Sequence, residues 1–271
     1  MKTLKRWRAL IVVVVFFVIL ILCRSMIQDA LLFFPSKFPQ GDWKPTSLEF
    51  EDAYFQAADG TKLHGWYCPC ENPRAIVLHA HGNAGHLAHR TPLMRFYQRD
   101  LKVASFIFDY RGYGRSEGSP SVKGALQDAR AARTWLAKKT GVKESQIVLT
   151  GQSLGAAVMV DLAADGGARG LVLENTFSSL KDIARHHYPL LSWLASSDAL
   201  NSVAKIKSYK GPLLQVHGDA DSIIPFALGV KLFEAANEPK DFLRIHGGDH
   251  NDPPSEEFKK KLDAFIEKLP P

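Results

Sequence analysis

The sequence predicts an α/β protein with a mostly parallel sheet and helices on both faces. Short apolar runs alternate with segments of helical spacing over most of its 271 residues, which is the pattern of repeated strand–helix units. Because parallel strands are buried on both faces, they are expected as continuous apolar runs. Six runs of this kind are present: Ala75–His79, Val103–Phe108, Ile147–Thr150, Leu171–Leu173, Pro212–Val216 and Phe242–Ile245. The length of the chain suits one large domain of this class.

Two further strands and the connecting helices complete this prediction. Glu49–Gln56 alternates between apolar and polar side chains, Asp59 and Gly60 form a turn, and Leu63–Tyr67 supplies an antiparallel partner. The longest helix is expected over Val122–Lys138, where apolar residues recur at helical spacing. The other helices are expected at 92–99, from 155 onward, at 226–236 and at 256–269.

The segment from Asn175 to Lys210 interrupts the alternation with polar and aromatic residues and contains no clear strand. It follows a predicted strand, so it lies at the carboxyl ends of the strands, where open α/β sheets bind their ligands. We therefore predict a small lid at about 175–210 within a domain that spans 49–271.

The N-terminal segment is basic and then strongly apolar. Met1–Arg8 carries four positive side chains, and the 15 residues Ala9–Cys23 form an unbroken apolar run. This run is shorter than the roughly 20 residues that a membrane helix needs. The flanking side chains of Trp7 and Arg24 can extend the span toward the membrane surfaces. We predict that residues 1–24 form an uncleaved membrane anchor.

The anchor predicts on which side of the membrane the domain lies. The strongly basic N-terminal end should remain in the cytoplasm, so we predict a single-pass protein whose globular domain is periplasmic or lumenal. Residues 25–48, rich in aromatic residues and proline, are predicted to be a connector. The alternative is a cleaved signal peptide, whose apolar region has a similar length. No A-x-A-like cleavage site follows the run, which disfavours that alternative.

The net charge of +6 is concentrated at the N-terminus. Five of the six excess positive charges precede the first acidic residue, which leaves about +1 for the rest of the chain. These five residues are Lys2, Lys5, Arg6, Arg8 and Arg24. A domain with so little excess charge is not expected to bind nucleic acid.

A serine nucleophile is predicted at Ser153. The strand at 147–150 leads into the pattern G-x-S-x-G, formed by Gly151, Ser153 and Gly155, and an Ala-rich helical segment follows. Glycines without Cβ atoms allow the strand and the helix to approach closely, which holds the serine in a sharp and exposed turn. The alternative is a serine that only caps the helix.

A serine hydroxyl is a weak nucleophile until a base takes its proton, and the base must be oriented by a third group. Candidates for these roles follow the later strands: Glu174, Asp219, Asp221, His246 and His250. We predict Asp221 and His250, because they lie deeper in their loops and can reach toward Ser153. His250 would serve as the base and then the acid, while Asp221 would fix its tautomer.

An oxyanion hole is also expected, because a tetrahedral intermediate needs two hydrogen-bond donors. The N–H of Leu154, directly after the nucleophile, is one candidate. The loop after the first buried strand should supply the second, and Gly82 and Gly85 allow its backbone to turn inward. We predict the N–H of Asn83 as this donor. The chemistry needs no metal and no organic cofactor.

The same loop contains four histidines: His79, His81, His86 and His89. No carboxylate or cysteine joins them at ligand spacing, so we predict solvated or backbone-bonded imidazoles and no metal site. Cys68 and Cys70 lack the second pair of ligands that a zinc site needs, and we interpret both as structural.

Six motifs resemble those of the α/β-hydrolase superfamily. They read V-L-H-A-H-G-N-A-G, F-D-Y-R-G-Y-G-R-S-E-G-S-P, L-T-G-Q-S-L-G-A-A-V, L-E-N-T-F-S-S-L, H-G-D-A-D-S-I-I-P and G-G-D-H-N-D. More narrowly, the chain is similar to the Bem46-like group of membrane-anchored serine hydrolases over about Glu49–Leu269. The resemblance implies a hydrolase fold, a catalytic triad and an oxyanion hole. The residues that it implies are Ser153, Asp221, His250, Asn83 and Leu154.

These observations predict a membrane-anchored serine hydrolase that cleaves an ester or thioester through an acyl-enzyme, as carboxylesterases, lipases and acyl-thioesterases do. Apolar lid residues suggest a small-molecule or acylated substrate with an apolar group, although ordinary packing would also explain them. They are Phe177, Leu190, Leu191, Trp193 and Leu194. One alternative is a peptidase or amidase on the same triad. Another is a catalytically silent hydrolase fold that serves as a binding module.

Overall fold

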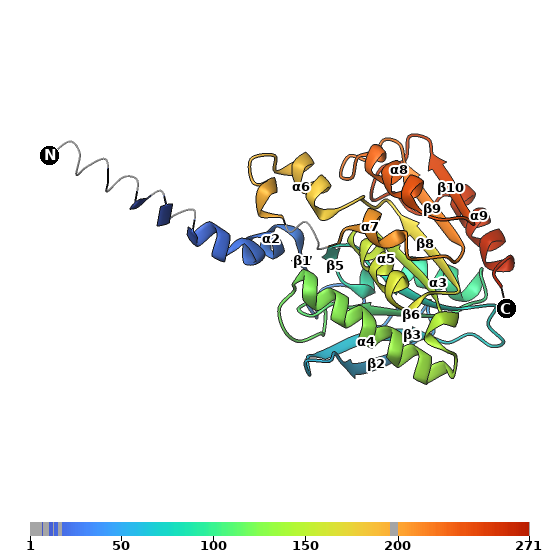
Figure 1. The fold of residues 1–271 in the computed structure, drawn as a ribbon. Coiled ribbons are helices and arrows are strands. Elements are labelled where there is room, and N and C mark those ends of the chain that lie inside the picture. The colour runs from blue at the N-terminus through green and yellow to red at the C-terminus, as the bar shows by residue number, and fades with distance from the viewer. Residues whose placement is uncertain (1–6, 8–10, 13, 16–17, 196–199, 271) are drawn as a thin grey trace.

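A computed structural model of the chain describes residues 7, 11–12, 14–15, 18–195 and 200–270. Its centre is an eight-stranded sheet (Figure 1). The strands are β2 (Glu51–Gln56), β3 (Lys62–Cys68), β4 (Ile76–Ala80), β6 (Ala104–Asp109), β7 (Val148–Gln152), β8 (Gly170–Glu174), β9 (Leu213–Gly218) and β10 (Lys240–Ile245). They lie in the order β10-β9-β8-β7-β4-β6-β3-β2, and only the β2–β3 and β3–β6 pairs are antiparallel. The predicted fold class is confirmed.

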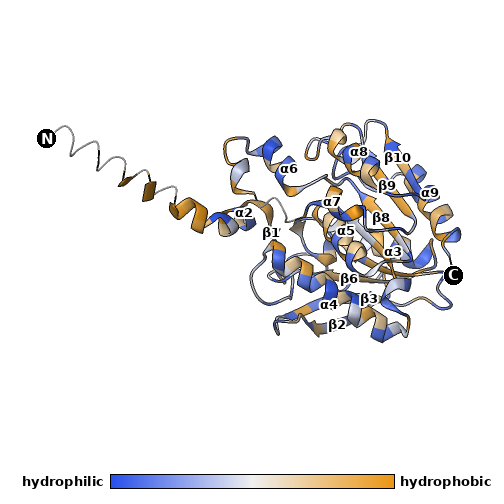
Figure 2. Ribbon diagram, in the orientation of Figure 1, coloured by the Kyte–Doolittle hydropathy of each residue, from blue (hydrophilic) through white to orange (hydrophobic). Residues whose placement is uncertain are grey.

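Helices cover both faces of the sheet. One face carries α4 (Val122–Thr140), α5 (Leu154–Gly166) and α8 (Phe226–Ala235), and the other carries α3 (Thr91–Arg99) and α9 (Glu256–Glu267). Successive residues of a strand enter opposite cores: in β7, Leu149 belongs to the first core and Val148 to the second. Burial on both faces explains why the inner strands β6, β7, β8 and β9 are largely apolar (Figure 2). Two short 3-10 turns, η1 (Leu87–Arg90) and η2 (Glu144–Gln146), connect these elements.

The region predicted as a connector, 25–48, contains ordered structure that docks on the domain. The helix α2 (Arg24–Leu32) is followed by a two-residue strand, β1 (Phe34–Pro35). This strand pairs in parallel with β5 (Ala84–Gly85), which lies in the loop after β4. The first part of the connector is therefore joined to the loop that carries Asn83.

Half of the predicted membrane anchor, residues 1–24, lies outside the described residues. Within the ranges that the structure describes, no helix combines the length and the apolarity needed to cross a membrane. Just before α2, the apolar side chains of Val18, Ile19, Ile21 and Leu22 are exposed. This part of the chain points away from the globular body (Figure 1).

The segment predicted as a lid has two parts with different positions. Its first part contains α6 (Leu180–His187) and the 3-10 turn η3 (Ser192–Leu194). Its second part contains α7 (Ser202–Ile206), which packs against α5 and α8, and both of its terminal residues are buried. The helix α7 therefore packs on neighbouring helices. Among the described residues of 175–210, those that border the site described below lie between 177 and 195.

Candidate active site

Ser153 lies at the turn between β7 and α5, where its backbone has φ 55° and ψ −119°. A positive φ is uncommon outside glycine, and strain of this kind concentrates at functional positions. Two glycines permit the turn. A Cβ at Gly151 would meet the backbone of α5, and a Cβ at Gly155 would meet the carbonyl oxygens of Ala80 and His81. The strand and the helix can approach this closely only because both positions lack side chains.

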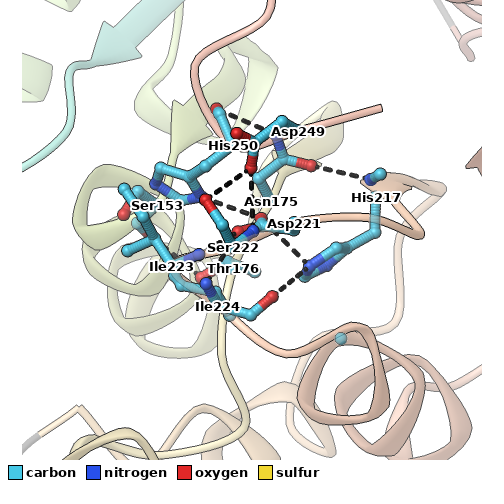
Figure 3. A network of polar contacts seen from close by, with 12 residues as sticks. Ser153, Asn175, Thr176, His217, Asp221, Ser222, Ile223, Ile224, Asp249 and His250 are labelled. Atoms are coloured by element: carbon cyan, nitrogen blue, oxygen red, sulfur yellow. Dashed lines mark hydrogen bonds and ion pairs between the residues drawn. The ribbon is translucent and has the colours of Figure 1, made fainter. Parts of the chain in front are cut away.

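Asp221 and His250 come together after β9 and β10. Asp221 Oδ2 lies 2.8 Å from His250 Nδ1, and Figure 3 shows the surrounding network. The other oxygen, Oδ1, accepts hydrogen bonds from the backbone N–H groups of Ile223 at 2.9 Å and Ile224 at 2.7 Å. In the described part of the chain no hydrogen bond joins the Ser153 hydroxyl to His250. Such bonds commonly tighten only when substrate is bound.

The Asp221 carboxylate is buried, yet its surroundings favour the charged form. Burial acts to raise its pKa, but hydrogen bonds from His217, His250 and the Ile224 N–H outweigh burial and hold the pKa of Asp221 well below its ordinary range. His217 Nε2 lies 3.4 Å from Oδ2. A charged carboxylate at Nδ1 of His250 favours the tautomer in which Nε2 is the proton acceptor.

The other candidate acids and the other candidate histidine lie elsewhere. Asp219 Oδ2 is 3.0 Å from His246 Nδ1 and 2.8 Å from Arg244 Nε, and the His246 side chain is 81% exposed. This pair is therefore on the surface. Glu174 contributes its backbone, because its carbonyl accepts a hydrogen bond from the Ser153 N–H at 2.8 Å. The Oε1 atom of Glu174 is buried without a partner in the described part of the structure.

Three side chains that sequence reasoning missed hold the loop of His250 in place. Gln152 Nε2 and Asn175 Nδ2 donate hydrogen bonds to the carbonyl of His250 at 3.3 and 3.1 Å. Asp249 Oδ1 accepts from the N–H groups of His250 and Ser222, at 2.7 and 2.8 Å, and so joins this loop to the loop of Asp221. Only their positions were a signal in the sequence. Gln152 ends β7, Asn175 follows β8, and Asp249 directly precedes His250.

Asn83 and Leu154 border the same pocket as Ser153. Leu154 is the first residue of α5, where a backbone N–H has no partner within the helix. Among the described residues, neither the Asn83 N–H nor the Leu154 N–H donates a hydrogen bond. The Asn83 carbonyl accepts hydrogen bonds from the Phe34 N–H at 2.9 Å and the Tyr113 hydroxyl at 2.6 Å. These contacts fix the backbone of the loop and leave the N–H of Asn83 available.

A pocket of about 350 Å³ opens onto Ser153, and its lining is predominantly apolar. A cavity of this size and character fits a small molecule with an apolar group. Of the residues predicted to line a lid, Phe177, Leu191 and Leu194 border this pocket. Leu190, which is 88% exposed, and Trp193 lie outside it on the surface. The α2 helix forms another part of the wall, which the sequence did not indicate.

Of the four histidines near the oxyanion loop, His79, His81 and His86 are buried, so these three are not the solvated imidazoles that were one part of the prediction. His79 Nδ1 lies 2.9 Å from Thr150 Oγ1, and burial lowers the pKa of His79 to about 3. His81 Nδ1 lies 2.7 Å from the carbonyl of Gly82. His86 is buried and stacks on the ring of His89. In the residues described, no group of three His, Cys, Asp or Glu side chains is placed to hold a metal ion.

The buried carboxyl of Glu174 predicts a pH dependence of stability. Burial raises its pKa from 4.5 to about 7, although the charge of Arg90 acts to lower it. Because the folded-state pKa is the higher one, the contribution to stability is fully present below pH 4.5 and is lost as the pH rises through 7. The free energy of unfolding decreases by about 3 kcal/mol over this range because of Glu174.

The variant Glu174→Gln should therefore lose less stability than the wild type between pH 4.5 and pH 8. Urea unfolding of both proteins across this range measures the difference. Two parallel pH profiles would show that Glu174 does not titrate in the way described.

Comparisons with known proteins agree with the fold. Residues 71–202 match the family model described as Hydrolase_4, serine aminopeptidase, S33. The structure of the Pyrococcus furiosus esterase Pf2001 superposes with a TM-score of 0.73 at 21% identity, over 88% of this chain and 98% of the esterase. The fold and the matched family define an α/β hydrolase of the serine-hydrolase type.

Relatives at higher identity narrow this assignment. The Mycobacterium tuberculosis protein Rv2307c is 36% identical, covering 97% of this chain and 95% of its own length. The α/β-hydrolase domain-containing protein WAV2 of Arabidopsis thaliana is 34% identical over 83% of this chain and 81% of its own. Bem46 of Schizosaccharomyces pombe is 35% identical over 82% of this chain and 79% of its own length. The chain belongs to the α/β-hydrolase family, in the group of relatives that includes Bem46 and WAV2.

Proposed function

We propose that this protein is an esterase or acyl-thioesterase that forms an acyl-enzyme on Ser153, with His250 as the base and Asp221 as its orienting acid. The observation that carries the proposal is the hydrogen bond of 2.8 Å between Asp221 and His250, at the same end of the sheet as a serine held at positive φ. An apolar pocket that opens onto this serine supports an acyl group as the substrate moiety. The esterase activity named for Pf2001 is in agreement with this chemistry.

The reaction begins when His250 Nε2 takes the proton of Ser153 Oγ as the oxygen attacks the carbonyl carbon of the substrate. The resulting oxyanion receives hydrogen bonds from the N–H groups of Leu154 and Asn83. The intermediate collapses, and His250 gives its proton to the departing alcohol or thiol. A water molecule, activated by the same histidine, then hydrolyses the acyl-enzyme and restores the serine.

Labelling with a fluorophosphonate probe tests this proposal. The probe phosphonylates an activated serine, so wild-type protein should become labelled and the variant Ser153→Ala should not. Circular dichroism of both proteins is the control for folding. A folded wild-type protein that takes up no probe would exclude the proposed nucleophile and would favour the silent binding module.

We also propose that residues 1–24 attach the enzyme to a membrane, with the hydrolase domain outside the cytosol. The support for this is the basic stretch followed by the apolar run in the sequence. The mass of the mature protein tests the attachment, because an anchor is retained. A mature chain that begins near Ser25 would instead identify a cleaved signal peptide.

A peptidase is the second candidate, because the matched family model carries the description serine aminopeptidase. The same triad would cleave an amide, and His250 would protonate the departing amine. Rates on p-nitrophenyl esters, acyl-thioesters and aminoacyl amides distinguish the two candidates. The apolar pocket favours esters and thioesters, whereas hydrolysis confined to aminoacyl amides would establish the peptidase.

A further inference from the structure

The α2 helix presents one face to the pocket of Ser153 and the other to solvent. Ile27, Gln28, Leu31 and Leu32 line the pocket. Residue 31 follows residue 28 by three positions and residue 27 by four, the spacing that places side chains on one face of a helix. Met26 is 72% exposed and does not line it. The η3 turn of the lid segment contacts α2, so these two elements close the pocket together. Without α2 the pocket would lack one of its walls.

The position of α2 is fixed by polar contacts at several points. Asp29 Oδ1 accepts a hydrogen bond from the Val122 N–H, at the start of α4, at 3.1 Å. An acid there also meets the positive end of the helix dipole. The carbonyl of Leu32 accepts a hydrogen bond from Asn83 Nδ2 at 2.9 Å. These bonds join α2 to the hydrolase body at a helix start and at the oxyanion loop.

The residues that follow α2 strengthen this attachment. Phe33 is buried in the same core as α4 and α5 and meets the ring of Tyr113 edge-on. The Phe34 N–H donates to the carbonyl of Asn83, and the Ser36 N–H donates to the carbonyl of Gly85. The helix is therefore held at both the pocket and the loop that carries the second oxyanion donor. Its apolar face has a defined place in the site.

We infer that α2 is a specificity element of the enzyme, which forms one wall of an acyl-binding pocket and selects substrates with an extended aliphatic acyl chain. The inference rests on the proposed function of Ser153. An acyl carbon placed at Ser153 has Asn83 and Leu154 on one side. Apart from Gln28 and His187, the remaining lining available to its chain consists of aliphatic and aromatic side chains. Each methylene buried there contributes about a fourfold gain in binding. An acetyl group is too short to make these contacts.

Tryptophan substitutions on the two faces of α2 test this inference. Ile27→Trp and Leu31→Trp place a larger side chain in the pocket, and Met26→Trp places the same side chain on the exposed face as a matched control. We expect kcat/KM for p-nitrophenyl decanoate to fall by about 50-fold in the first two variants, which corresponds to about three excluded methylenes. The rate with p-nitrophenyl acetate should change less than threefold. The Met26→Trp control should have the same kcat/KM as the wild type with both esters.

Binding of decanoate to variants that also carry Ser153→Ala gives a second measurement, independent of turnover. Calorimetry should detect binding to Ser153→Ala and its loss in the double variants with Ile27→Trp or Leu31→Trp. If decanoate binds in this way but no ester is hydrolysed, the proposed function is wrong, and with it the role of α2 in substrate selection, although α2 still forms a wall of an acyl-binding pocket. If esters are hydrolysed with the same chain-length preference in all variants, the inference about α2 is wrong. Failure of decanoate to bind Ser153→Ala would also overturn it.

Discussion

Replacing Asp221 with asparagine is expected to lower kcat for ester hydrolysis on the order of 10⁴-fold while leaving the fold intact. The amide of asparagine can donate a hydrogen bond toward His250 Nδ1, which favours the tautomer with its proton on Nε2. In that tautomer His250 cannot accept the proton of Ser153. The effect is enlarged because the Asp221 side chain is fully buried, where its charge stabilises the imidazolium that forms during the reaction.

Asp219→Asn is the matched control for this prediction. Asp219 lies two residues earlier and is bonded to Arg244 and His246 at the surface, so its replacement should change kcat by less than about threefold. Steady-state kinetics with p-nitrophenyl esters measure kcat for both variants, and the Tm of each variant checks that it is folded. Equal loss of activity in both variants would exclude Asp221 as the specific partner of His250. A large loss in Asp219→Asn alone would reverse the assignment.

Adding a methyl group at Gly155 is expected to have the largest effect on stability. The new Cβ in Gly155→Ala would meet the carbonyl oxygens of Ala80 and His81, and backbone atoms in a buried strand cannot move aside as a flexible side chain does. We expect the free energy of unfolding to fall by roughly 3 kcal/mol. The corresponding decrease in Tm is roughly 6 to 12 °C.

Gly82→Ala is the control, because the nearest atom to a Cβ at this position, the Cβ of Ser153, lies at 3.7 Å, an ordinary van der Waals distance. Its Tm should stay within about 3 °C of the wild type. Thermal and urea unfolding of both variants measure the difference. A Gly155→Ala protein as stable as Gly82→Ala would show that the close approach of β7, β4 and α5 is not required for the turn at Ser153.

The strand–helix order was predictable because the apolar pattern of a parallel sheet is local. Each buried strand of this sheet fell within or beside an apolar run, and the start of β7 at Val148 and of β9 at Leu213 differ from the predicted starts by one residue. The G-x-S-x-G turn was also predictable, since its requirement for glycine at both 151 and 155 is a local steric one. The proximity of Asp221 and His250 was predictable from the rule that loops at the carboxyl ends of neighbouring strands meet.

The role of α2 could not be read from the sequence, because it depends on contacts between distant segments. Residues 25–32 are apolar at several positions, and an apolar stretch next to a predicted anchor has an obvious alternative explanation. Tertiary contacts place this segment beside the pocket, such as the hydrogen bond from Asn83 Nδ2 to the carbonyl of Leu32, between residues 51 positions apart. The lid was misjudged for a similar reason. The helix α7 packs against α5 and α8 rather than at the pocket, a tertiary contact that local polarity does not indicate.

The most direct test of Ser153 as the nucleophile is to identify the acylated residue during turnover. Wild-type enzyme is mixed with excess p-nitrophenyl decanoate, quenched in acid within milliseconds, digested, and its peptides are weighed by mass spectrometry. We predict a decanoyl group on the peptide that contains Ser153, and none on any peptide of the Ser153→Ala variant, which should not turn over. Acylation of another residue, or ester hydrolysis that persists in Ser153→Ala, would contradict the account.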